Sequence, residues 1–172
     1  SPFLRMSQGL RYFLRYPYGC VEQTSSGVLP LAALRDVIQK GLIPDISTSE
    51  TDKFIKPGIE RLFSMQTSEG GFGYWPGDRT THKWGSIYAL TALTRAGIAG
   101  YELPKDRMDK ALMNLREQIK GSGADEYVYR AFGAYILALN KSLDREVFGK
   151  AFEKIDSQPR EAVMLVLLSA RI

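Results

Sequence analysis

Apolar residues recur along this chain at helical spacing. One stripe, at i, i+3, i+4, i+7 and i+11, consists of Met108, Ala111, Leu112, Leu115 and Ile119. Similar stripes run through 55–63, where Pro57 and Gly58 predict a helix start or kink, and through 148–155. No segment alternates as a strand would. The pattern predicts an all-α fold with helices at 3–15, 21–40, 51–65, 85–97, 105–119, 125–139, 145–155 and 159–171.

Three of these helices are apolar on nearly every side, at 31–34, 89–93 and 135–139, which indicates burial on most sides. Each is followed by a turn and an amphipathic partner, so the repeated unit is an inner helix, a turn and an outer helix. Such units stack into solenoids or close into rings. The last helix is of the inner type and has no partner. We therefore expect an incomplete ring, with an apolar surface at 159–171 that favours self-association.

Composition narrows the class of protein. The 172 residues, 44% hydrophobic and 24% charged, are enough for one domain with a real core. The 23 basic and 19 acidic residues are interleaved, which indicates a solvated surface rather than a nucleic-acid site. The longest apolar run, 162–170, is too short to span a bilayer. No signal peptide opens the chain, and we expect its start to have been cut from something longer.

A thiol and a carboxamide stand three residues apart at the mouth of a predicted helix. They belong to Cys20, the one cysteine of the chain, and to Gln23. Residues at i and i+3 share a helix face, with Cβ atoms roughly 5 to 6 Å apart. If the thiolate attacks the side-chain carbonyl and ammonia leaves, the product is an internal thioester. The alternative is a purely structural role, in which Cys20 is a buried and unreactive thiol.

The surrounding residues make the motif specific. The ordered set Pro17, Tyr18, Gly19, Cys20, Glu22 and Gln23 resembles the thioester motif of the alpha-2-macroglobulin and complement family, and Tyr16 completes a lead-in similar to that of the bacterial branch. The linker 66–76, with its Gly-Gly-Phe-Gly string, resembles the repeat signature of α/α toroids. The resemblance implies that residues 1–172 are part of one thioester-containing α/α toroid from a larger multidomain protein.

The resemblance also implies a function. The parent would be a protease inhibitor in which bait cleavage uncovers the thioester, and a lysine of the protease attacks Gln23, leaving an amide cross-link and a free Cys20. This is single-turnover capture rather than enzymatic turnover, and it needs no cofactor or metal. The implied partners are proteases and the parent's other domains. The implied location is the periplasm, in a parent held at the inner membrane by a lipid anchor.

Several further residues are expected to support the thioester. Water hydrolyses thioesters, so we expect four aromatic residues to shield the bond, with plain helix packing as their alternative role: Tyr16, Tyr18, Tyr74 and Trp75. Gly19 is expected to adopt a backbone conformation that other residues avoid. Glu22 is expected either to orient the loop or to cap free amide groups.

Two rival functions use the same cysteine. Cys20 could act as the nucleophile of an acyl-transfer enzyme with His82 as its base. However, His82 does not match the histidine that redirects the thioester in some complement relatives, and its polar neighbours predict a surface loop. A zinc-dependent toroid enzyme would need a carboxylate where Tyr18 stands. An α/α-toroid binding module with an unreacted Cys20 remains the third alternative.

Overall fold

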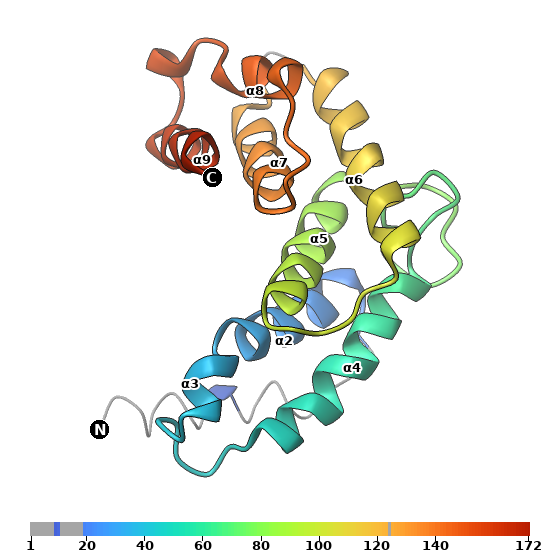
Figure 1. Ribbon diagram of the computed structural model, residues 1–172. Helices are drawn as coiled ribbons and strands as arrows, with labels where there is room; N and C mark the ends of the chain where they lie inside the picture. The colour runs from blue at the N-terminus through green and yellow to red at the C-terminus, as the bar shows by residue number, and fades with distance from the viewer. Residues whose placement is uncertain (1–8, 11–18, 124) are drawn as a thin grey trace.

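The computed structural model describes residues 9, 10, 19–123 and 125–172, and these ranges are helical without a strand (Figure 1). The predicted first helix, 3–15, lies outside them except for residues 9 and 10. The helices are α2 (Val21–Ala33), α3 (Arg35–Gln39), α4 (Thr48–Ser64), α5 (Lys83–Ile98), α6 (Lys105–Lys120), α7 (Tyr127–Leu139), α8 (Arg145–Phe152) and α9 (Arg160–Arg171), with a short 3-10 helix at Ile155–Ser157.

The helices form two layers. α2, α5, α7 and α9 lie side by side in one row, and α4, α6 and α8 cover one side of that row (Figure 1). Successive helices alternate between the rows, so the chain repeats an inner helix, a turn and an outer helix. This confirms the all-α prediction, and the layering is that of an arc of an α/α toroid.

The burial pattern explains the two layers. In α5, the side chains of Ala89, Leu90, Ala92 and Leu93 are at most 1% exposed, because α5 has neighbours on most sides. α6 instead buries one stripe, and that stripe is the one predicted from its helical spacing. An apolar stripe on one face suits an outer helix, since its other face meets water.

The predicted helix at 21–40 is in fact two helices. α2 ends at Ala33 and α3 begins at Arg35, with Leu34 between them at φ −99° and ψ 6°. Pro30 lies in the last turn of α2 and has no N–H to donate to the preceding turn, which weakens the helix at this point. The prediction of one continuous helix was therefore wrong.

The start of α4 was also misplaced. The helix begins at Thr48 because Ser47 and Glu50 form a capping box: the Glu50 N–H donates to Ser47 Oγ at 3.2 Å, and the Ser47 N–H donates to Glu50 Oε2 at 3.0 Å. The helix then continues through Pro57 and Gly58. Gly58 is needed for close packing, since a Cβ at this position would lie 2.4 Å from Val28 Cγ2 on α2.

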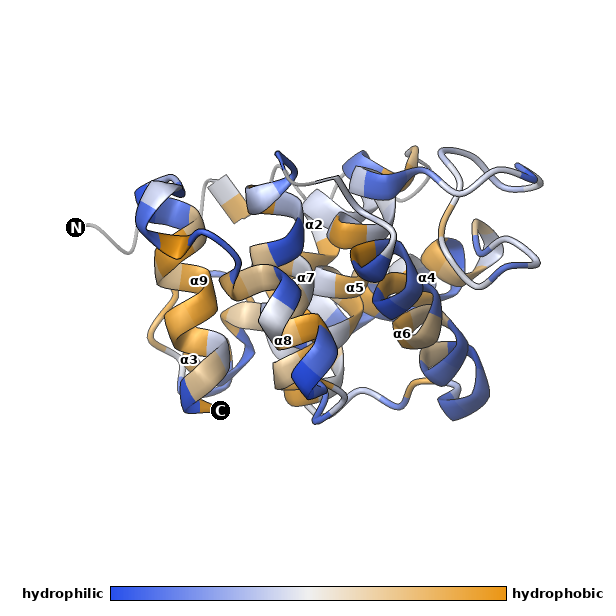
Figure 2. Cartoon of the chain, turned by 90° about the horizontal axis from the view of Figure 1, so that it is seen from above, coloured by the Kyte–Doolittle hydropathy of each residue, from blue (hydrophilic) through white to orange (hydrophobic). Residues whose placement is uncertain are grey.

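Of the last two helices, α9 ends at Arg171 as predicted, but α8 ends three residues before the predicted end at 155. α8 stops at Phe152 because Glu153 leaves the helical conformation, at φ −52° and ψ 127°, and Lys154 is left-handed, at φ 53°. α9 packs against α7 through Ala162, Val166 and Ser169. Its other face is open, with Met164, Leu167 and Ile172 each more than half exposed. Figure 2 shows α9 as a largely apolar helix at the end of its row, so the predicted apolar surface is present.

Candidate functional site

Cys20 sits at the N-terminus of the inner helix α2. It is the N-cap residue, with extended backbone at φ −64° and ψ 176°, and it is 6% exposed. The first turn of α2 is held by the glycine-rich linker, because the Val21 N–H donates to the Tyr74 carbonyl at 3.0 Å. Cys20 is thus a buried residue at the positive end of the α2 dipole.

Gln23 folds back onto the residue that carries the thiol. Its Oε1 accepts a hydrogen bond from the Cys20 N–H at 3.1 Å, in the geometry of a capping box. The side chain of Gln23 is exposed, whereas Cys20 is buried. The structure therefore brings the Gln23 carboxamide to the backbone of Cys20, the residue that carries the thiol.

Gly19 makes room for this arrangement. A Cβ on Gly19 would lie 2.4 Å from the Cβ of Gln23 and 2.9 Å from its Oε1, closer than real side chains approach. The prediction of an unusual backbone conformation stays a prediction, but close approach is a sufficient reason for glycine. The Gly19 carbonyl is anchored by Thr24 Oγ1 at 3.2 Å and by Arg61 Nη2 at 3.4 Å.

Arg61 is a site residue that sequence reasoning missed. It comes from α4, 42 positions along the chain from the glycine that it contacts. It lies in an amphipathic helix among other charged residues, and no local pattern separates it from surface arginines. Only the packing of α4 against α2 reveals the contact.

Tyr74 and Glu22 form a polar pair beside the thiol. The Tyr74 hydroxyl donates to Glu22 Oε2 at 3.0 Å. That hydrogen bond, with desolvation and the Cys20 thiol as further contributors, raises the pKa of Tyr74 to about 12. Tyr74 is therefore a neutral phenol at physiological pH. The hydrogen bond ties Glu22 to the glycine-rich linker, whereas shielding of the thiol by Tyr74 stays a prediction.

Trp75, another predicted shielding residue, lies on the surface. Trp75 is 48% exposed, and its ring contacts that of Tyr74 at a centroid distance of 6.4 Å. The backbone N–H groups of Tyr74 and Trp75 both donate to Asp78 Oδ2 at 2.8 Å, which fixes the turn. Tyr16 and Tyr18 lie outside the described residues, so their shielding role stays a prediction.

His82 is exposed, but it is also a structural residue. It caps α5, with Nδ1 accepting from the Gly85 N–H at 2.9 Å, while its own N–H donates to the Phe72 carbonyl at 2.8 Å. Its ring meets that of Tyr74 edge-on at 5.3 Å. Because Nδ1 is already an acceptor for a backbone donor, it is not a free base for an enzyme nucleophile.

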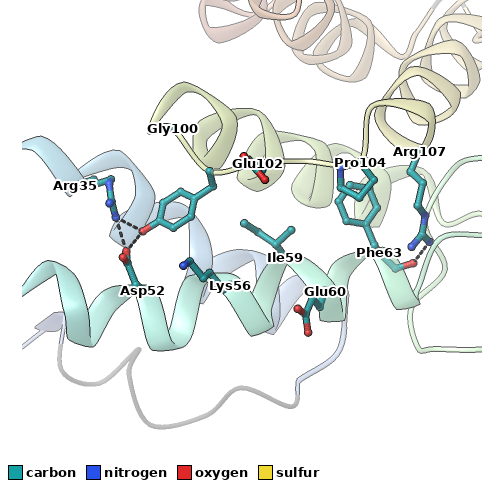
Figure 3. Close-up of a pocket in the computed structure, with 11 residues that line it drawn as sticks. Arg35, Asp52, Lys56, Ile59, Glu60, Phe63, Gly100, Glu102, Pro104 and Arg107 are labelled. Atoms are coloured by element: carbon teal, nitrogen blue, oxygen red, sulfur yellow. Dashed lines mark hydrogen bonds and ion pairs between the residues drawn. The ribbon is translucent and has the colours of Figure 1, made fainter.

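A separate cleft of about 660 Å³ lies between α4 and the turn at 99–104 (Figure 3). At one end, Asp52 accepts hydrogen bonds from Arg35 and Tyr101. At the other, Arg107 stacks over Phe63 with 4.8 Å between the guanidinium carbon and the ring centroid. Asp52 is thus ion-paired with Arg35, and Arg107 is hydrogen-bonded to the Phe63 carbonyl and to Gln66 Oε1. Cys20 and Gln23 do not line the cleft.

Among the described residues, no helix has the length and apolar content needed to cross a bilayer. Within the same ranges, no group of three or more His, Cys, Asp or Glu side chains could hold a metal ion.

The solved structures that resemble this fold include alpha-2-macroglobulins. The native conformation of the Escherichia coli protein matches with a TM-score of 0.79 and 23% identity, over 98% of this chain and 11% of that one. Salmonella alpha-2-macroglobulin reacted with methylamine matches with a TM-score of 0.77 and 23% identity, over 98% of this chain and 12% of that one. The trypsin-activated Escherichia coli protein matches with a TM-score of 0.71 and 22% identity, over 91% of this chain and 13% of that one.

Sequence comparison gives the family. No protein-family model matches the chain. Alpha-2-macroglobulin of Escherichia coli is 28% identical over 150 residues, which are 80% of this chain and 9% of that protein. An alpha-2-macroglobulin homolog of Yersinia pestis is 32% identical over 146 residues, 81% of this chain and 7% of the other. The chain thus spans less than a tenth of either relative's length. It belongs to the bacterial alpha-2-macroglobulin family, whose motif the residues around Cys20 resemble.

Proposed function

We propose that Cys20 and Gln23 form an internal thioester, and that this chain is the thioester-bearing segment of a bacterial protease inhibitor. The observation that carries the proposal is the 3.1 Å hydrogen bond from the Cys20 N–H to Gln23 Oε1. It draws the carboxamide back to the residue that bears the thiol. The pair occurs in a chain whose sequence relatives are alpha-2-macroglobulins.

The burial of the two residues suits covalent capture. The acyl carbon belongs to the exposed Gln23, where an incoming amine can reach it, and the leaving sulfur belongs to the buried Cys20. A lysine of an attacking protease forms an amide with Gln23, and Cys20 leaves as a thiolate. The bond is used once, so the chain acts as a trap rather than an enzyme.

The relatives support amines and proteases as the reacting partners. One solved relative is described as reacted with methylamine and another as trypsin-activated. Both descriptions concern whole proteins far longer than this chain. We therefore place the bait segment and the gating surfaces in other domains of the parent, with residues 1–172 as part of one toroid domain. The periplasm and a lipid anchor on the parent are part of the same proposal.

The test is the intact mass of the freshly purified protein before and after methylamine, with thiol alkylation in parallel. We expect a species lighter by one ammonia, which gains methylamine and releases one alkylatable thiol. Gln23→Glu is the matched control, because it keeps the side-chain shape but has no ammonia to lose. The proposal is refuted if the protein has its full unmodified mass, its mass does not change with methylamine, and its thiol is alkylated without methylamine treatment.

A further inference from the structure

The peptide unit that joins Gly19 to Cys20 connects a cation on α4 to the side-chain carbonyl of Gln23. Its oxygen accepts hydrogen bonds from Thr24 Oγ1 at 3.2 Å and from Arg61 Nη2 at 3.4 Å. Its N–H donates to Gln23 Oε1 at 3.1 Å. Because a trans peptide unit is planar, its oxygen and its N–H point in fixed, opposite directions. The two groups that hold the oxygen therefore also aim the N–H.

The next peptide unit is fixed as well. The Cys20 carbonyl accepts from the Thr24 N–H at 2.9 Å, and the Val21 N–H donates to the Tyr74 carbonyl at 3.0 Å. The extended conformation of Cys20, at φ −64° and ψ 176°, is thus held from both sides. The Cys20 N–H can turn away from its acceptor only if one of these contacts breaks.

Arg61 reaches the Gly19 oxygen at a cost. Its side chain is half-buried, and its Nε is buried without a hydrogen-bond partner within the described ranges. A buried donor without a partner is rare and needs a physical reason. No carboxylate of the described residues forms an ion pair with Arg61. Its positive charge is directed at the Gly19 carbonyl instead.

We propose that Arg61 and Thr24 are positioning residues for amine capture. Both act through the peptide that joins Gly19 to Cys20, by aiming and polarising its N–H. Hydrogen bonds in a chain polarise one another, so a bond to the peptide oxygen strengthens the donor on its nitrogen. A charged donor does this more strongly than a neutral one. The inference rests on the proposed function, since it concerns how the bond of that function is opened.

The polarised N–H acts when an amine opens the thioester. The amine nitrogen forms a bond to Gln23 Cδ, and the electron pair of the carbonyl moves onto Oε1. The Cys20 N–H, already placed at that oxygen, stabilises the negative charge. When the carbonyl re-forms, the bond from Cδ to Sγ breaks and sulfur leaves with the electron pair. The nitrogen gives one proton to water, which reaches the exposed Gln23, so the products are an amide and a free thiol.

The experiment measures the rate at which methylamine opens the thioester, followed by thiol release and intact mass. Thr24→Val removes the hydroxyl at similar volume, and Arg61→Met removes the charge but keeps an unbranched stem. Thr24→Ser and Arg61→Lys restore the hydroxyl and the cation. Thr51→Val is the matched control for threonine, because this buried residue donates to a backbone carbonyl at 3.0 Å. Arg95→Met is the control for arginine, because this half-buried residue donates to a tyrosine hydroxyl at 3.5 Å.

A second readout reports on the N–H itself and needs no thioester. Because Cys20 is the one cysteine of the chain, ¹⁵N-labelled cysteine gives a single backbone amide signal in NMR. We expect Arg61→Met and Thr24→Val to move that amide proton upfield, since its hydrogen bond weakens, while Arg95→Met leaves it in place. A role of Arg61 in stability alone would lower the Tm and leave this signal unchanged.

Removal of a direct oxyanion donor slows a reaction by about 100-fold or more. Arg61 and Thr24 act one peptide away, so we expect Arg61→Met and Thr24→Val each to slow methylamine opening by about 10-fold. Arg61→Lys and Thr24→Ser should restore most of the rate, and both controls should follow the wild type. Circular dichroism checks that each variant folds.

The inference is overturned if Arg61→Met and Thr24→Val both open at the wild-type rate, or if neither moves the Cys20 amide signal; the proposed function then stands. Equal slowing in Thr24→Ser and Thr24→Val would also overturn it, because the hydroxyl would then not matter. If the wild type forms no thioester, the proposed function fails and the inference fails with it.

Discussion

Replacing Gly19 by alanine is the sharpest test of the site geometry. The added methyl group would lie 2.4 Å from Gln23 Cβ, 2.9 Å from its Oε1 and 3.4 Å from its Cδ. Rotation of the glutamine could relieve the contact with the oxygen, but the Cβ is fixed to the backbone of α2. The methyl group can therefore be accommodated only if the first turn of α2 shifts and the carboxamide moves away from Cys20.

The size of the effect follows from three contributions. Overpacking costs about 1–3 kcal/mol, and loss of the hydrogen bond from Cys20 to Gln23 costs about 0.5–1.5 kcal/mol. The smaller entropy of the unfolded alanine chain offsets about 0.4–1 kcal/mol. The net loss is about 2 kcal/mol, which for a chain of 172 residues lowers the Tm by about 4–8 °C.

Thermal unfolding of Gly19→Ala measures the stability loss, and the intact-mass assay measures the thioester. Gly149→Ala is the matched control: Gly149 lies in the outer helix α8, and a Cβ there would meet nothing within 4 Å. That control should leave the thioester intact and raise stability by about 0.5–1 kcal/mol. A Gly19→Ala variant with wild-type Tm and wild-type thioester yield would show that the close approach does not constrain the site.

Three further predictions concern the scaffold. Arg130→Met should lower stability by about 2–4 kcal/mol in denaturant titration, since this 1% exposed side chain bonds a buried carbonyl at 2.8 Å; an unchanged midpoint would contradict it. Desolvation raises the pKa of Asp52, but hydrogen bonds from Tyr101 and Arg35 outweigh it and lower that pKa. Ionised Asp52 therefore stabilises the fold above about pH 4, and this stabilisation is lost as the pH falls further. The Tm of the wild type should accordingly exceed that of Asp52→Asn at neutral pH, and the difference should shrink on acidification. Leu167→Glu should abolish self-association in light scattering, because this exposed apolar residue lies on the open face of α9; a monodisperse wild type would refute that.

The sequence predicted well what depends on local pattern. The helical stripes located most helices because their period reflects which face meets the core, as in α6. The motif singled out Cys20 and Gln23 because both lie within one helical turn, and the structure joins them by a hydrogen bond; their reaction stays a prediction. Helix ends were less accurate where a single residue decides them, as at Leu34 and Ser47.

Contacts between distant parts of the chain could not be predicted. Glu22 and Tyr74 are 52 positions apart, and the linker that carries Tyr74 reaches Cys20 only because it crosses the N-termini of the inner helices α2 and α5. Arg61 reaches Gly19 from the outer layer. Each depends on how helices pack, which no local pattern encodes.

The proposed thioester would place two opposed demands on the site, since the bond must be made and then kept. The Cys20 N–H donates to Gln23 Oε1, the oxygen on which negative charge would develop both when sulfur attacks and when an amine attacks. Local electrostatics therefore accelerate formation and capture alike, and they also accelerate hydrolysis. Storage of the acyl group must come from the exclusion of water. Gln23 is exposed among the described residues, so we propose that a cover over the acyl carbon excludes water until capture. Removal of that cover, rather than a change within the Cys20–Gln23 pair, is then the proposed trigger.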